Sequence, residues 1–219
     1  MAGGSGSRMN SEQPKQFLVL EDRPILMHTI DAFNNYSSDI SIIVVLPKEH
    51  ISTWENLVSQ YLYKTPHQIT IGGVTRFDSV QSGLSKIVGE GLVAIHDGAR
   101  PLISTDVIER TFHSALKQGN GIAAVQVKDS IRKMNNEKSE AVDRNLYYSV
   151  QTPQTFTLEI IRNAFENAAS NAFTDDASVV EAFGKDIHLV EGSYENLKIT
   201  TPEDLVIAAS ILQKRHKNT

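Results

Sequence analysis

Apolar residues along this chain follow two spacings, one typical of helices and the other of buried strands. Helical spacing, with apolar positions three and four residues apart, occurs in segments 23–33, 54–61, 77–87, 105–116, 158–168, 174–184 and 201–212. Short and nearly continuous apolar runs, several of them rich in β-branched residues, lie at 40–46, 68–73, 92–97, 121–127, 187–192 and 196–200. These runs predict strands that are buried on both faces.

Strands that alternate with helices in this way predict an α/β protein. We expect a Rossmann-like, mostly parallel sheet with helices on both faces. In such sheets, ligands bind just beyond the carboxyl ends of the strands. Functional residues are therefore expected directly after the apolar runs. No internal repeat or linker interrupts the pattern, so residues 1–219 are expected to form a single domain.

The alternation breaks at about residues 128–150. Two segments without helical periodicity flank the polar stretch 135–140, whose composition is typical of a turn. This pattern predicts a protruding β-hairpin, which we call the β-arm. Because an isolated two-stranded excursion is only marginally stable in water, we expect a partner to contact it.

The composition excludes several classes of function. The chain has no cysteine, so disulfides, thiolate catalysis and cysteine-bound zinc are excluded. Its formal net charge of −5 disfavours non-specific binding to nucleic acid. No apolar run approaches the ~20 residues that cross a bilayer, and no signal-peptide pattern precedes the first glycines. We therefore expect a cytoplasmic protein that binds neither membranes nor nucleic acid.

The opening segment "AGGSGSR" carries the first candidate chemistry. Glycines let backbone N–H groups approach phosphate oxygens, although the segment matches neither the Walker loop nor the G-x-G-x-x-G pattern. Two cations follow, Arg8 and Lys15. Fixed cations stabilise the negative charge that develops when a polyphosphate loses pyrophosphate. The pattern favours a nucleotide-phosphate site, with a simple glycine-rich turn and solvated cations as the alternative.

Ordered motifs along nearly the whole chain resemble the cytidylyltransferases that act on small sugar-alcohol phosphates. The motifs are "AGGSGSRM", "PKQF", "GGVTRFDSV", "HDGARP", "VKDSIRK", "VDRN", "QTPQTF", "TDDAS" and "VEGSYENLKITTPEDL". They are most similar to the members that use 2-C-methyl-D-erythritol 4-phosphate. The resemblance implies a nucleotidyltransferase fold and transfer of CMP from CTP to that acceptor, with pyrophosphate as the second product, in non-mevalonate isoprenoid precursor synthesis.

The resemblance also assigns residues to CTP. Backbone groups that hold its phosphates and part of the base would come from Ala2, Gly3, Gly4 and Gly6. Arg8 and Lys15 match the cations that stabilise the transition state. Gly73 and Ser79 fall where the family reads the edge of cytosine. An ion pair between Arg76 and Asp78 is an alternative interpretation of the same loop.

A second set of residues is assigned to the acceptor by the same resemblance. Arg144 and Lys198 match the residues that position its phosphate, and a planar guanidinium suits bidentate binding of phosphate. Further contacts are implied for Asp97, Arg100, Ser130 and Thr152. Thr174 and Asp175 would shape the same pocket, and a helix cap explains Thr174 equally well.

Asp97 has more than one possible role. It ends a buried strand, where ligands are expected, and it could contact a metal, the ribose or the acceptor hydroxyls. A structural ion pair with Arg100 is the alternative. We expect Mg²⁺ as the divalent cofactor, held mainly by the CTP phosphates, with Asp97 as a candidate ligand. Strand alternation should point His96 away from Asp97, either into the core or behind the residues that contact the ligand.

The resemblance implies a homodimer. In the family, the β-arm interlocks with that of a second subunit, so Ser130 and Arg144 would act in trans. The family also has a central strand directly before its glycine loop. We therefore expect that strand to be missing before residue 1 of this sequence.

Three other functions stay open. A ribitol-5-phosphate cytidylyltransferase would share the glycine loop and "PKQF", but "HDGARP" and "VDRN" favour methylerythritol phosphate. A nicotinamide-dependent oxidoreductase is disfavoured by the failed glycine spacing and by the added cations. A non-catalytic nucleotide-binding protein would bind CTP without releasing pyrophosphate.

Overall fold

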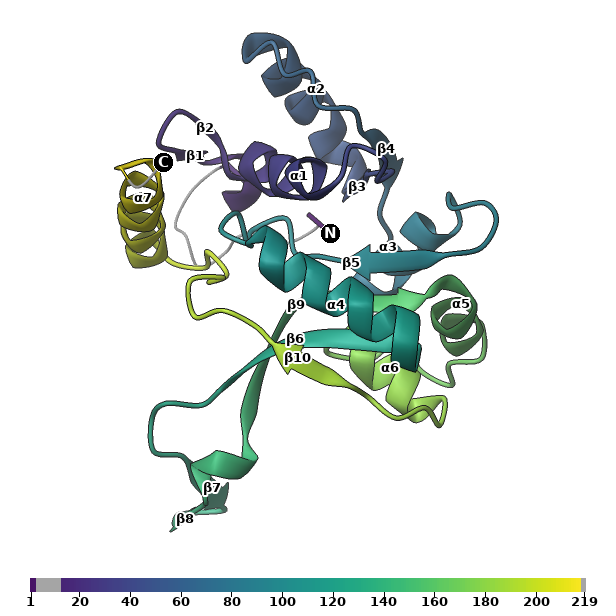
Figure 1. Ribbon diagram of the computed structural model, residues 1–219, viewed down its shortest axis with the longest axis vertical. Coiled ribbons are helices and arrows are strands. Elements are labelled where there is room, and N and C mark those ends of the chain that lie inside the picture. The colour runs from purple at the N-terminus through teal and green to yellow at the C-terminus, as the bar shows by residue number, and fades with distance from the viewer. Residues whose placement is uncertain (3–12, 218–219) are drawn as a thin grey trace.

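Two groups of strands form the main sheets in the computed structural model of this chain, which describes residues 1–2 and 13–217 (Figure 1). In the smaller group, β3 (Ile43–Leu46) runs parallel to β4 (Gln68–Ile71). The larger sheet has the order β10-β6-β9-β5. Its members are β5 (Leu92–Ile95), β6 (Asn120–Gln126), β9 (Tyr148–Thr157) and β10 (Leu189–Glu191). Because β9 runs antiparallel to both β5 and β6, the sheet is mixed, and the prediction of a mostly parallel sheet is corrected on this point.

Strand β9 was not predicted, because its sequence does not look like a central strand. It contains Pro153, which cannot donate a ladder hydrogen bond, and several buried polar side chains. The register between β6 and β9 shifts at this point, from Ile122 opposite Gln154 to Ala124 opposite Val150. Such a bulge accommodates the proline and redirects neighbouring side chains. It brings Thr152 to the end of β5, where the functional residues gather.

The predicted helices are all present. They are α1 (Ile25–Tyr36), α2 (Ile51–Gln60), α3 (Arg76–Leu84), α4 (Thr105–Gln118), α5 (Leu158–Glu166), α6 (Asp176–Ala182) and α7 (Pro202–Lys217). Alternate residues of β6 pack on opposite faces, since Ile122 joins the cluster of α5 and α6 whereas Ala123 joins that of α4. Helices therefore cover both faces of the larger sheet, as predicted. Within the described ranges, no helix is long and apolar enough to cross a membrane.

Two local predictions were wrong. Segment 196–200 is not a strand, although Ile199 N–H donates to Ala99 O at 2.8 Å. Thr174 does not cap α6, because the cap is Asp175, whose carboxylate accepts from Ser178 N–H at 3.0 Å. Asp is at least as good an N-cap as Thr, and a shift of one residue is beyond what sequence spacing resolves.

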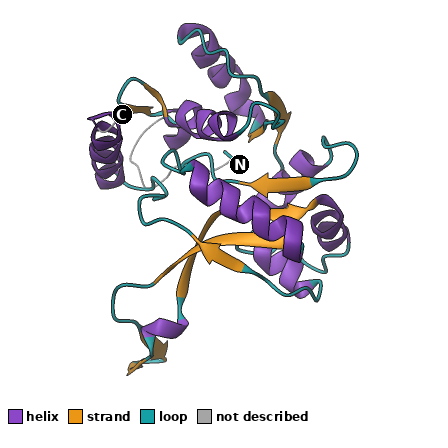
Figure 2. Cartoon of the chain, in the orientation of Figure 1, coloured by secondary structure: helices purple, strands orange, loops and turns teal. Residues whose placement is uncertain are grey.

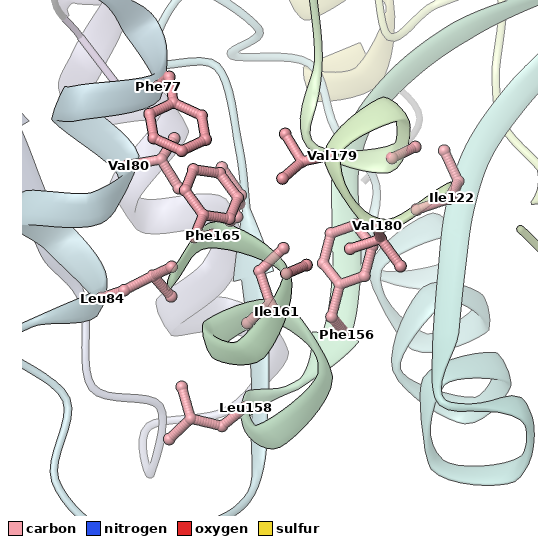
Figure 3. Packing of buried hydrophobic residues seen from close by; sticks show 13 residues of the cluster. Phe77, Val80, Leu84, Ile122, Phe156, Leu158, Ile161, Phe165, Val179 and Val180 are labelled. Carbon is pink, nitrogen blue, oxygen red and sulfur yellow. The ribbon is translucent and has the colours of Figure 1, made fainter. Parts of the chain in front are cut away.

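The largest apolar cluster joins α3 to α5, α6 and the larger sheet (Figure 3). The ring of Phe77 stacks on that of Phe165, with centroids 4.5 Å apart. A second cluster surrounds Trp54 in α2, which is fully buried and stacks on Phe17 at 6.0 Å. Phe17 ends the 3₁₀ turn Lys15–Phe17, so this cluster anchors the segment that carries Lys15.

Met1 and Ala2 connect the two groups of strands through backbone hydrogen bonds. Ala2 N–H donates to Val45 O in β3 at 3.1 Å, and Gly98 N–H donates to Met1 O at 2.7 Å. Gly98 follows directly on Asp97 at the end of β5. The backbone of these two residues therefore lies beside the carboxyl end of that strand.

Residues within the predicted β-arm form a hairpin of β7 (Arg132–Asn135) and β8 (Lys138–Ala141). All eight residues of these two strands are exposed. Figures 1 and 2 show the hairpin at the end of two extended segments of chain, away from helices α1 to α7. A short β1 (Val19–Leu20) and β2 (Arg23–Pro24) form the other two-stranded pair.

Buried histidine should make the fold sensitive to acid. His28 in α1 is 8% exposed, its Nε2 lies 2.9 Å from Leu20 O, and burial lowers its pKa from 6.5. The folded state therefore binds fewer protons than the unfolded state below pH 6.5, and stability should fall as the pH drops, by at most about 1.4 kcal/mol per pH unit from this group. Urea unfolding at pH 7.5 and 5.5 should show a smaller fall in His28→Gln than in the wild type. The exposed His113→Gln is the control, and equal falls in all three proteins would contradict the prediction.

Candidate active site

Asp97 is the electrostatic centre of the candidate site. Its side chain is 13% exposed, and its Oδ2 lies 3.1 Å from Lys198 Nζ and 3.2 Å from Arg100 Nε. Burial by itself would raise the pKa of Asp97, but Lys198 and Arg100 hold it well below the usual range. The fold thus brings together three predicted site residues from two distant segments. The predicted Asp97–Arg100 pair is present, and Lys198 shares the same oxygen.

Thr152 and His96 form a chain of hydrogen bonds that begins at the backbone of Asp97. Thr152 Oγ1 accepts from Asp97 N–H at 3.0 Å and lies 3.1 Å from His96 Nδ1, while His96 Nε2 lies 3.1 Å from Arg100 O. This arrangement fits a neutral imidazole that accepts at Nδ1 and donates from Nε2. Burial lowers the pKa of His96 to about 3. Its ring packs on Phe33, in agreement with the prediction of a core position.

Segment 196–199, which carries Lys198, is held by residues that the sequence analysis missed. Asn196 is fully buried, and its Nδ2 donates to Thr152 O at 2.9 Å and to Gln151 Oε1 at 3.2 Å. Arg100 Nη1 donates to Asn196 O at 2.8 Å. Gln151 and Thr152 both lie in the bulge of β9. The irregular strand therefore fixes the position of Lys198.

Gly73 and Ser79, predicted to read cytosine, are in contact: Gly73 lies in the loop between β4 and α3, and Ser79 lies in the first turn of α3. Gly73 N–H donates to Ser79 Oγ at 3.1 Å, and the same hydroxyl lies 3.3 Å from Gly73 O. A Cβ on Gly73 would lie 2.3 Å from the Cβ of Asp78, so only glycine fits this close approach to the helix. The loop, residues 72–75, is called the base loop below.

The alternative ion pair between Arg76 and Asp78 is wrong. Asp78 forms a capping box with Thr75, with Thr75 N–H donating to Asp78 Oδ2 at 2.9 Å. Arg76 instead donates to both carboxylate oxygens of Asp176, at 2.7 and 2.5 Å. Nothing in the spacing of the sequence links these two residues, which lie 100 positions apart.

The predicted residues from the N-terminal segment and from the loop before α6 lie as follows. Ala2 lies beside Gly98, and its carbonyl accepts from Gln16 Nε2 at 2.7 Å. Lys15 is half-buried in the 3₁₀ turn that precedes β1. Thr174 is exposed in the loop before α6. The predicted phosphate-binding residues Gly3, Gly4, Gly6 and Arg8 lie outside the residues that the structure describes.

Ser130 and Arg144 lie in the β-arm and are exposed. Arg144 begins the 3₁₀ turn Arg144–Leu146 and donates from Nη1 to Lys128 O. Among the described residues, no hydrogen bond or ion pair joins either side chain to the Asp97 cluster of the same chain. The structure of one chain therefore does not bring them to that cluster.

The acidic and histidine side chains near Asp97 determine how the expected Mg²⁺ could be bound. Within the described ranges, no three His, Asp or Glu side chains gather to hold a metal ion. Asp97 contributes one carboxylate, whose Oδ2 contacts both Lys198 and Arg100. A single carboxylate oxygen fits a hard cation that is held mainly by substrate phosphates.

Comparison with known proteins places this site in a family. Residues 1–214 match the family model described as "IspD: 2-C-methyl-D-erythritol 4-phosphate cytidylyltransferase". The chain belongs to this family. It is therefore a nucleotidyltransferase, which argues against the oxidoreductase alternative.

Individual cytidylyltransferases of the family are similar along nearly their whole length. The chain is 45% identical over 212 residues to the 2-C-methyl-D-erythritol 4-phosphate cytidylyltransferase of Bacteroides fragilis, covering 97% of each protein. It is 39% identical over 218 residues to that of Geobacillus kaustophilus, covering 98% of this chain and 96% of the relative. Among solved structures, the 4-diphosphocytidyl-2C-methyl-D-erythritol synthase of Anaerococcus prevotii superposes with a TM-score of 0.80 at 28% identity, covering 97% of this chain and 95% of the other.

Proposed function

We propose that this chain transfers CMP from CTP to 2-C-methyl-D-erythritol 4-phosphate, giving 4-diphosphocytidyl-2-C-methyl-D-erythritol and pyrophosphate. The match of residues 1–214 to the cytidylyltransferase family carries the proposal. The cluster of Asp97, Arg100 and Lys198 at the carboxyl end of β5 supports it, because two fixed cations suit the phosphate of the acceptor. The reaction belongs to non-mevalonate isoprenoid precursor synthesis, and the cytoplasm stays our prediction for its location.

The transfer proceeds as an in-line displacement. A phosphate oxygen of the acceptor attacks the α-phosphorus of CTP, and the bond from that phosphorus to the bridging oxygen breaks, with its electron pair leaving on pyrophosphate. A phosphate monoester is largely dianionic at neutral pH, because its second pKa is about 6. No general base is therefore needed, and positioning and charge stabilisation supply the rate enhancement.

Each described residue has a physical role in this scheme. The base loop, which includes Gly73, receives the cytosine together with Ser79 of α3. Lys198 and Arg100 attract the acceptor phosphate, and Asp97 holds both cations in place. Lys15 stabilises the charge on the triphosphate as pyrophosphate leaves, and the same role is proposed for Arg8, which lies outside the described residues. Asp97 is fixed as an anion by its two partners, so it orients groups and does not transfer a proton.

A divalent cation fits this site. Asp97 would be its protein ligand, with the CTP phosphates as its main ligands, and when bound it would neutralise charge on the phosphate oxygens. Thr152 would keep Asp97 oriented through the bond to its backbone N–H.

The β-arm supports the homodimer in this proposal. It carries exposed large apolar side chains: Met134, Leu146, Tyr147, Tyr148 and Val150. Leu146, two residues from Arg144, is 77% exposed. Burying such a surface against a second copy would stabilise both arms. Ser130 and Arg144 then complete the acceptor site of the partner.

A pyrophosphate-release assay tests the proposed function. With CTP and Mg²⁺, we expect kcat/KM for 2-C-methyl-D-erythritol 4-phosphate to exceed that for ribitol 5-phosphate at least ~tenfold, since a difference of ~1.4 kcal/mol in transition-state binding suffices. A reaction without acceptor is the control. Faster turnover of ribitol 5-phosphate would contradict the assignment of the acceptor. Binding of CTP with no release in the presence of either acceptor would instead identify a nucleotide-binding protein.

A further inference from the structure

The ion pair of Arg76 and Asp176 joins the part of the molecule built on β3 and β4 to the part built on the larger sheet. Arg76 is the first residue of α3, which packs on β3 and β4 and follows the base loop. Asp176 is the first residue of α6, which packs with α5 beside the larger sheet. Two hydrogen bonds, of 2.7 and 2.5 Å, connect the guanidinium with both carboxylate oxygens. Among the described residues, no strand pairing connects β3 and β4 with the larger sheet.

Local structure does not account for the position of Arg76. The N-terminal end of a helix carries partial positive charge, so an arginine in the first turn of α3 is placed unfavourably for its own helix. Asp176 has an exposed fraction of 0%, and burial raises its pKa against the opposing effect of Arg76. Buried ion pairs of this kind add little net stability, but they can specify how elements are arranged.

Asp176 is fixed to the strand beside the active site. Gln154 Oε1 accepts from Asp176 N–H at 3.0 Å and from Ala177 N–H at 2.8 Å, and Gln154 Nε2 donates to Asp175 Oδ2 at 2.9 Å. Gln154 lies opposite Ile95 in the register of β9 and β5. Ile95 is two residues before Asp97. The carboxylate that holds Arg76 is thereby connected to the strand that presents Asp97.

Arg76 is connected to the base loop, as Asp176 is connected to the strand that presents Asp97. It directly follows Thr75, the cap of α3, and the capping box with Asp78 fixes its backbone. Because Ser79, one turn further along α3, holds Gly73, a movement of α3 would move the base loop with it. The ion pair thus sets the position of the base loop relative to the Asp97 cluster.

We propose that Arg76 and Asp176 are positioning residues that set the spacing between the base loop and the Asp97 cluster, and so the affinity for CTP. This inference rests on the proposed function, because one CTP molecule must place its base in the loop while its α-phosphorus meets the acceptor held at Lys198. The apolar contact of Phe77 with Phe165 also joins α3 to α5, but apolar contacts allow sliding, whereas a bidentate ion pair fixes direction.

Steady-state kinetics of Asp176→Asn test the inference. This variant keeps the shape of the side chain and removes its charge. We expect the KM for CTP to rise at least tenfold, with kcat and the KM for 2-C-methyl-D-erythritol 4-phosphate changed less than threefold. Equilibrium titration with CTP should show the same loss. Asp31→Asn is the control, because it removes the carboxylate charge from another partly buried ion pair, that of Asp31 with Arg23 at 2.7 Å. An unchanged KM for CTP in Asp176→Asn would overturn the inference.

A double variant separates positioning from the cost of an unpaired buried charge. Arg76→Met combined with Asp176→Leu replaces the pair by apolar groups, which often preserves folding. The raised KM for CTP should persist in this protein. A return to the wild-type KM would overturn the role of the ion pair.

If Asp176→Asn fails to fold, Arg76→Lys takes its place. This variant should raise the KM for CTP, because an ammonium lacks the forked geometry of a guanidinium. An unchanged KM for CTP would again overturn the inference. Wild-type turnover in the same assay shows that the proposed function itself holds, and its absence would mark the failure of that function instead.

Discussion

Replacing Lys198 with alanine is expected to lower kcat/KM about a thousandfold, or ~4 kcal/mol. Lys198 Nζ is fixed 3.1 Å from Asp97 Oδ2, so its charge is already in place when the acceptor phosphate arrives. The variant loses this contact with phosphate and also one of the two cations that balance Asp97. The side chain is 42% exposed, so folding should change little. Steady-state rates with both substrates varied, together with a thermal unfolding curve, measure the two effects.

Two further variants make the Lys198 result specific. Lys198→Arg keeps the positive charge and should recover part of the activity. Lys214→Ala removes an exposed lysine from α7 and should behave like the wild type. Activity of Lys198→Ala within threefold of the wild type would remove Lys198 from the proposed site.

Replacing Arg144 with alanine should lower kcat/KM by a similar factor, about a thousandfold, without affecting stability. The guanidinium is exposed on the β-arm and donates to one carbonyl of its own chain, that of Lys128, so its loss costs the fold little. A bidentate contact with the acceptor phosphate would, however, be lost. Lys133→Ala removes an exposed charge from the same arm and is the matched control. Full activity of Arg144→Ala would contradict the role of the β-arm in the reaction.

Mixing two inactive variants tests whether Arg144 acts in trans. A heterodimer of Arg144→Ala with Lys15→Ala would contain one intact site, made of Lys15 from the first chain and Arg144 from the second. Half of the dimers in an equal mixture are heterodimers, so activity should recover to about a quarter of the wild type. No recovery, with heterodimers demonstrated, would show that both residues act within one chain.

Elements with regularly spaced apolar residues were predictable, whereas an element whose residue types are unusual for its structure was not. The helices of this chain carry regular apolar spacing, and the sequence analysis found each of them. Strand β9 combines Pro153 with buried glutamine and threonine, a composition that normally argues against a central strand. Only the bulge opposite Ile122 and Ala124 makes that composition compatible with the sheet, and pairing between distant strands is not visible in a single sequence.

The same distinction holds for the site. Asp97, Arg100 and Lys198 lie in recognisable motifs, and the fold brings Arg100 Nε and Lys198 Nζ within 3.2 Å of one oxygen of Asp97. Asn196 and Asp176 also lie in quoted motifs, but their contacts were not predicted. Their partners, Gln151 and Arg76, lie far away in the sequence, so neither interaction has a local signal.

Trp54 gives this protein an optical reporter that requires no label. It is the only tryptophan of the chain, so intrinsic emission excited at the red edge of the absorption band arises from one known place. Its ring is stacked on Phe17, two residues beyond Lys15. Any rearrangement of that turn when a nucleotide arrives would alter the surroundings of a single fluorophore, and the native sequence can thus be followed by spectroscopy in real time.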